Sequence, residues 1–179
     1  MAEQTGFKLG WKTFYYWLIF IAMYGIYKAL PVFPLSIICG TNESNFQHYK
    51  ATFFALLILA LIEYAVHRRQ IADLAGFWHP RLLIAVLAPW FIFLIWYFAP
   101  AVYGQKMPNI GIEVLYSNVT TVISGFVILV FEQAFTQIRF TKLQRNLLYV
   151  LLALSVLYYL VFTFAYLPWA DVFVEPKWK

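Results

Sequence analysis

The sequence has little charge and little cysteine. Only 12% of its 179 residues are charged, whereas a soluble globular domain carries about 25%. A single cysteine, Cys39, allows no disulfide within the chain and no paired-cysteine metal or redox motif. The 13 Lys and Arg residues are scattered between apolar runs and form no basic patch. The composition therefore excludes a soluble globular domain, and we expect no nucleic-acid partner.

Long apolar runs dominate what is present, with 63% hydrophobic and 21% aromatic residues. A transmembrane helix needs about 20 mostly apolar residues to cross roughly 30 Å of hydrocarbon. Five stretches qualify, at about residues 11–30, 48–67, 82–103, 110–131 and 147–167. Pro31 and Pro34 should end the first helix, and Pro89 should kink the third. We therefore expect an all-α fold, an integral membrane bundle of five transmembrane helices forming one domain over residues 1–179.

Basic residues predict the orientation, because Lys and Arg in short loops are retained in the cytoplasm. With five spans, the N-terminus shares a side with the second and fourth loops. That side holds Lys8, Lys12, Arg68, Arg69, Arg81, Arg139, Lys142 and Arg145. The other side holds Lys50, Lys106, Lys177 and Lys179, with Lys28 at its interface. We predict a cytoplasmic N-terminus and an external C-terminus in a cell membrane. No small-residue cleavage site follows the first run, so we expect it to be retained.

The polar segment before the second span reads TNESNFQHYK. Ser44 and Gln47 have the spacing of a capping box, and Glu43 would lie favourably at the helix N-terminus. Capping does not explain His48, which could face the bundle together with Glu43 and Glu113 as a metal or proton-relay site. Two interpretations stay open here, a capped helix with a polar surface and a functional outer site.

The segment from Asn42 to Tyr64 resembles an uncharacterised family of small polytopic prokaryotic membrane proteins. The corresponding loop of that family reads approximately N-E-S-x-W-E-H-x-K, with an E-Y pair downstream. The matching residues are Asn42, Glu43, Ser44, His48, Lys50, Glu63 and Tyr64. Phe46 and Gln47 depart from the pattern, and the missing acid at Gln47 disfavours a metal site. The resemblance implies a multi-pass protein of a prokaryotic inner membrane and no particular activity.

Carboxylates near the other ends of the spans form a second candidate site. Glu63 and His67 are four residues apart and share a helix face, and Glu132 could join them. A charged carboxylate in hydrocarbon costs at least about 2.5–3.5 kcal/mol, so an intramembrane acid is a functional hypothesis. It could serve as a proton or cation site, or pair structurally with nearby arginines. The arginines in question are Arg68, Arg69 and Arg139.

A stripe of small and hydroxylated residues follows one face of the fourth predicted span. Its members are Ser117, Thr120, Thr121, Ser124 and Gly125. Such residues allow close helix approach in lipid, and they can also line a ligand cavity. In either case we expect this helix to be the one least exposed to lipid.

Three functions follow from these features. We predict a non-catalytic accessory or assembly subunit of a larger membrane complex, with the lipid bilayer and other membrane subunits as partners, because the commoner catalytic motifs are absent. The alternative is a small-molecule or ion carrier, or a protein binding a hydrophobic ligand such as a quinone, isoprenoid or pigment, through Glu63, Glu113 or Glu132. A lipid-modifying enzyme using Glu43 and His48 as acid and base is less favoured. The sequence identifies no catalytic residue, metal ligand or cofactor.

Overall fold

The computed structural model describes residues 6–104, 109–165, 167 and 169–174. Within these residues the chain is all-α, which confirms the all-α part of the predicted fold class. The elements are α1 (Leu9–Ala29), α2 (Phe33–Ile38), α3 (Asn45–His67), α4 (Leu74–Tyr103), α5 (Ile110–Phe135), α6 (Lys142–Phe164) and the 3-10 helix η1 (Asp171–Phe173). Two short elements, α2 and η1, were not expected from the apolar runs.

Four helices of the described chain are long and apolar enough to cross a membrane, namely α3, α4, α5 and α6. Their qualifying stretches are 23 or 25 residues long, which suffices for the hydrocarbon core at 1.5 Å per residue. Helix α1 has 21 residues but is not among the four. Its two lysines and its Tyr and Trp residues lower its mean hydropathy. The structure thus shows a helical bundle compatible with a multi-pass membrane protein.

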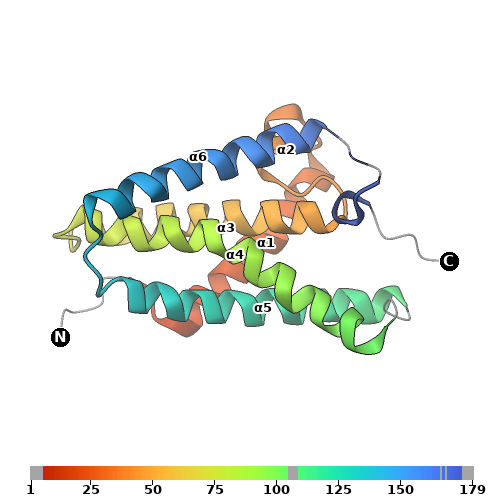
Figure 1. Ribbon diagram of the computed structural model, residues 1–179, viewed down its shortest axis with the longest axis horizontal. Coiled ribbons are helices and arrows are strands. Elements are labelled where there is room, and N and C mark those ends of the chain that lie inside the picture. Colours follow the sequence, from red (N-terminus) through yellow and green to blue (C-terminus); the bar gives the residue numbers. More distant parts are fainter. Residues whose placement is uncertain (1–5, 105–108, 166, 168, 175–179) are drawn as a thin grey trace.

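Proline and glycine explain where several helices end. Helix α1 stops at Ala29, shortly before Pro31, as the sequence predicts. The chain then turns into α2, which has Pro34 in its first turn, where a missing N–H costs nothing. Helix α4 changes direction along its length (Figure 1), and Pro89 within it removes one helical hydrogen bond. It ends before Gly104, whose φ of 64° is favourable only for glycine.

A capping box occurs in the structure, but at a different helix from the predicted one. Thr141 and Gln144 exchange both bonds of the box at the start of α6. Ser44 does hold the N-cap position of α3, yet its side chain makes no capping hydrogen bond. Its backbone N–H instead donates to Asn42 Oδ1 at 3.0 Å, so Gln47 has no N-cap donor to accept from. The predicted box at Ser44 and Gln47 is therefore wrong.

Helices α3 and α4 form the centre of the bundle (Figure 1). Helix α3 also packs against α1, whereas α5 packs against α1 and α4, and α6 packs against α4 and α2. The apolar stretch of α3 is 56% buried and that of α5 is 33% buried. We expected α5, which carries the stripe of small residues, to be the least exposed helix. That expectation is wrong, because α3 packs against more elements.

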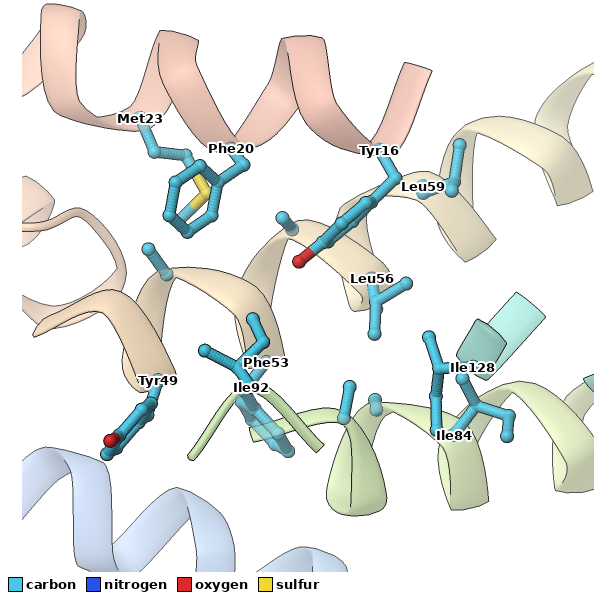
Figure 2. Close-up of a cluster of buried hydrophobic side chains, with 14 of the residues drawn as sticks. Tyr16, Phe20, Met23, Tyr49, Phe53, Leu56, Leu59, Ile84, Ile92 and Ile128 are labelled. Atoms are coloured by element: carbon cyan, nitrogen blue, oxygen red, sulfur yellow. The ribbon is translucent and has the colours of Figure 1, made fainter. Parts of the chain in front are cut away.

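The core lies where α1, α3, α4 and α5 meet. Figure 2 shows side chains of these helices, including Tyr16, Phe53, Leu56, Ile84 and Ile128, packed between the ribbons. Two ends flank this core. The cluster end is the end at which α1 and α4 start and at which α3 and α5 finish. The cap end is the opposite end, where α3 starts beside η1.

Candidate functional site

Glu63 is the centre of a charged group at the cluster end. It lies in the last turns of α3, and its side chain is fully buried. Its Oε1 accepts a hydrogen bond from the backbone N–H of Phe7 at 2.8 Å. Its Oε2 accepts from Lys12 Nζ at 2.6 Å and from Arg81 Nε at 2.7 Å. These three donors satisfy a carboxylate that would otherwise be costly to bury.

Lys12 connects Glu63 to a second acid. Its Nζ donates to Glu132 Oε1 at 2.6 Å as well as to Glu63. Arg81 Nη2 lies 3.7 Å from the same Glu132 oxygen. The four side chains come from α1, α3, α4 and α5, and none is more than 7% exposed. We name Lys12, Glu63, Arg81 and Glu132 the charge cluster.

Arg81 is held from its own helix as well. Its Nη1 donates to the backbone oxygen of Phe77, one turn earlier on α4, at 2.8 Å. Its guanidinium carbon lies 3.6 Å from the centre of the Phe77 ring, which is a cation–π contact. Because its Nε, its Nη1 and one face of its guanidinium are all engaged, Arg81 is held in one orientation toward the two carboxylates.

An open cavity of about 680 Å³ adjoins the charge cluster. All four cluster residues contribute to its wall. Other wall residues are Phe7, Gln70, Asp73, Gln133 and Gln137. The wall thus combines four buried charged residues with amide-bearing and aromatic ones, and convergent polar groups in a pocket mark it as a candidate binding site.

The structure brings together two of the predicted residues at this end, Glu63 and Glu132. His67 does not share their ion pairs, since its Nδ1 lies 3.1 Å from the backbone oxygen of Glu63 and its ring packs on Phe7. In the described residues no ion pair joins the two acids to any of the three predicted arginines. That pairing is wrong, because Arg68 follows Glu63 by five positions, about 140° around the helix, and Arg139 lies beyond the end of α5 at Phe135.

The predicted outer site contains ordinary structural contacts. Glu43 forms an exposed ion pair with Lys28 at 2.8 Å. His48 Nδ1 lies 2.9 Å from the backbone oxygen of Ser44, and its ring packs among aromatic side chains of α1 and α4. Glu113 lies in the first turn of α5. These contacts explain Glu43 and His48 without a ligand, and an outer functional site stays a prediction.

The small-residue stripe of α5 faces the interior of the bundle. Gly125 lies against the Tyr16 ring of α1, and a Cβ atom at Gly125 would collide with it. Thr120 and Ser124 are buried, and their hydroxyl groups have no hydrogen-bond partner in the described chain. A cavity of about 10 Å³ beside His48 is about large enough for one water molecule. The stripe residues lining it are Ser117, Thr120 and Thr121. The stripe therefore serves close packing and leaves little empty space.

Three buried cations were missed as site residues, because the sequence analysis used them only for orientation. Two are Lys12 and Arg81 of the charge cluster. The third is Lys50, which is fully buried and donates to Ser36 O at 2.7 Å and Thr163 Oγ1 at 3.1 Å. Arg81 and Lys50 lie more than a turn inside apolar helices. An ionisable residue in that position is itself a signal of a buried role.

The lone cysteine lies at the cap end, directly after α2. Cys39 is buried and unpaired. Burial raises the pKa of its thiol, and the nearby charge of Lys50 opposes that shift. A thiol with a raised pKa is a poor nucleophile at neutral pH. We therefore assign Cys39 a packing role.

The described residues contain no group of three or more His, Cys, Asp or Glu side chains that could hold a metal ion. Comparisons with protein-family models, curated proteins and solved structures found no match for the sequence. The site must therefore be interpreted from its geometry.

Proposed function

We propose that this multi-pass membrane protein binds a small polar molecule in the cavity beside the charge cluster, as a ligand-binding protein or carrier. The observation that supports this is the meeting of four buried, ionised side chains on the wall of a cavity of about 680 Å³. Buried ion pairs are weak contributors to stability, and apolar replacements are often as stable or more stable. Charged residues inside membrane bundles commonly mark ligand or ion pathways.

The architecture of the cluster favours a role in which binding changes helix packing. Each of its four members comes from a different helix, so any ligand that weakens one ion pair alters the contacts of α1, α3, α4 and α5 together. The volume also lies within the range of about 300–1,000 Å³ for small-molecule pockets. A carrier needs this coupling between ligand contacts and helix contacts.

We further propose that α1 is a fifth span and that the cluster end faces the cytoplasm. The start of α1, the α3–α4 and α5–α6 connections and the starts of α4 and α6 lie at this end, and together they carry most of the Lys and Arg residues. The C-terminus would then be external. The resemblance of the 42–64 segment supports a prokaryotic inner membrane. Reporter fusions at both termini test this topology, and reporters active on the same side would contradict it.

Access of water to the cavity tests the proposed function. In a Cys39→Ala background, we expect a cysteine at Gln133 on the cavity wall to react in native membranes with a small, water-soluble, cationic thiosulfonate. A cysteine at Ser124, which is buried two turns earlier on α5, is the matched control and should stay unreacted. An unreactive Gln133→Cys protein would overturn the proposal.

A second candidate is the accessory subunit predicted from the sequence. Helix α6 favours it, because only 11% of its apolar stretch is buried inside the chain, against 56% for α3. Lipid or another subunit must cover the remaining apolar surface. Purification in mild detergent distinguishes the two, since a stable partner should copurify with the protein. A lone, monodisperse species of 21.0 kDa would contradict this candidate.

A further inference from the structure

We infer that the cavity beside the charge cluster selects a small organic cation, such as an alkylammonium or guanidinium compound. The inference rests on the proposed function, because it concerns the same cavity. Among the described wall residues, Lys12 and Arg81 are positive. The negative wall residues are Glu63, Asp73 and Glu132. The wall therefore carries one more negative than positive charge, and a monovalent cation would balance it.

The cations of the wall are already engaged with the protein. Lys12 Nζ donates to both carboxylates of the charge cluster. Arg81 donates through Nε to Glu63 and through Nη1 to the backbone, and one face of its guanidinium covers a phenylalanine ring. Its Nη2 makes no hydrogen bond in the described chain and lies 3.7 Å from Glu132 Oε1. An anionic ligand would have to compete with these short, charge-assisted bonds. At Arg81 Nη2 an anion would also lie close to the Glu132 carboxylate, so the wall favours a cation over an anion.

Glu132 keeps more hydrogen-bonding capacity in reserve than Glu63. Glu63 already accepts three hydrogen bonds, and both of its oxygens are engaged. Glu132 accepts through Oε1 alone, and nothing in the described chain donates to its Oε2 although the side chain is only 6% exposed. Asp73 lies at the rim, where its Oδ1 accepts from the backbone N–H of Ala75. An ammonium group can donate to the spare oxygen of Glu132, where it would share the charge of that carboxylate with Lys12 and so weaken their ion pair.

The size and the remaining wall favour an organic molecule over a bare ion. The cavity volume of about 680 Å³ is far larger than a single metal ion needs. Gln70, Gln133 and Gln137 also line it, and amide oxygens can accept further N–H donors. The apolar residues Phe7 and Ile71 line it as well, and a hydrocarbon part can lie beside them. We therefore expect a compound with a cationic head and a small apolar body.

Three probes of similar shape and different charge test the inference. Benzylamine is cationic at pH 7, benzyl alcohol is neutral and benzoate is anionic. Binding of each to the full-length protein in lipid nanodiscs is measured by titration calorimetry at low ionic strength. We expect benzylamine to bind most tightly and benzoate most weakly. Benzoate binding as tight as benzylamine would overturn the inference and leave the proposed function intact.

Variants locate the charge that selects the ligand. Glu132→Gln keeps the shape and the acceptor for Lys12 but removes the charge, and it should weaken benzylamine binding about tenfold while changing benzyl alcohol binding little. Asp73→Asn keeps the oxygen that accepts from Ala75. It should weaken benzylamine binding less than Glu132→Gln does, because an exposed charge is screened. Unchanged benzylamine binding by folded Glu132→Gln would contradict the inference.

Substitutions that add charge to the wall outside the charge cluster test the inference without removing any of the cluster's ion pairs. Gln133 neighbours Glu132 on the cavity wall and is half-buried. Gln133→Glu should strengthen benzylamine binding several-fold, and Gln133→Lys should weaken it by a similar factor. If no probe binds although Gln133→Cys is labelled, the cation inference fails alone. If Gln133→Cys is also unlabelled, the proposed function fails with it.

Discussion

The two ends of the bundle are held by different interactions. At the cluster end, buried ion pairs join four helices beside an open cavity. At the cap end, η1 folds onto the bundle, and Phe173 packs on the rings of Phe46 and Phe162, with centroids 4.8 and 5.4 Å away. Beside it, Asn45 donates to Tyr97 Oη, which in turn donates to Asp171.

This difference indicates where a ligand can enter. Aromatic packing fills the cap end, and the small cavity beside His48 measures only about 10 Å³. At the cluster end, a cavity of about 680 Å³ adjoins the buried ion pairs. We therefore expect a polar ligand to enter at the cluster end and not at the cap end.

The largest expected effect comes from breaking the charge cluster. Glu63→Leu leaves Lys12 and Arg81 buried without their shared acceptor, which should lower the free energy of unfolding by about 3–5 kcal/mol. Lys28→Ala at the cap end removes an ion pair whose lysine side chain is 70% exposed, and exposed pairs contribute about 0–1 kcal/mol. Thermal unfolding in one detergent, followed by circular dichroism, compares the two variants. Equal losses would show that the ends do not differ.

A smaller loss is expected from the aromatic cap. Phe173→Ala empties a buried ring position between two other rings and should cost about 3 kcal/mol. Trp169 lies four residues earlier and is 81% exposed, so Trp169→Ala should change stability by no more than about 0.5 kcal/mol. The same unfolding assay applies, with limited proteolysis of the C-terminal segment as a local readout. A Phe173→Ala protein as stable as the native one would show that η1 does not secure the cap end.

The bundle was largely predictable from the sequence, and its short elements were not. Apolar runs of about 20 residues reveal long helices because hydrocarbon imposes both length and composition. Pro31 marks the end of α1 for a local reason, the loss of a hydrogen-bond donor. Helices α2 and η1 are too short to carry such a signal. Phe173 in η1 owes its place to contacts with distant rings.

The candidate site was half predictable. Glu63 and Glu132 stand out because carboxylates are rare in apolar runs. Their true partners, Lys12 and Arg81, also lie in or beside such runs, but topology counting treats each cation as a loop charge. Lys12 is 51 residues from Glu63 and 120 from Glu132 along the chain. Pairing over such separations depends on how the helices pack, which one sequence does not reveal.

Two glycines, one at each end, test how tightly the chain packs around them. Gly40 at the cap end lies against the Tyr24 ring, and a Cβ atom there would collide with it. Gly40→Ala should therefore cost about 1–3 kcal/mol through overpacking. Gly10 in α1 at the cluster end has no neighbouring atom within 4 Å of an added Cβ, so Gly10→Ala should cost nothing and favour the helix slightly. A destabilised Gly10→Ala protein beside an unaffected Gly40→Ala protein would contradict the packing described at these two positions.

The smallest expected effect is a difference in thiol reactivity between the ends. Burial raises the pKa of Cys39, so less of it is thiolate at neutral pH than for an exposed cysteine, whose pKa is about 8.5. A cysteine at exposed Gln137, in a Cys39→Ala background, is the cluster-end comparison. At pH 7, iodoacetamide should alkylate Cys39 of the native protein several-fold more slowly than the cysteine of Gln137→Cys. The alkylation rate of Cys39 should also continue to rise at pH values where the Gln137→Cys rate no longer changes. Lys50→Met removes the charge that opposes the shift and should move the Cys39 profile to still higher pH. Coincident pH profiles for Cys39 and Gln137→Cys would mean that the cap end admits water as freely as the cluster end.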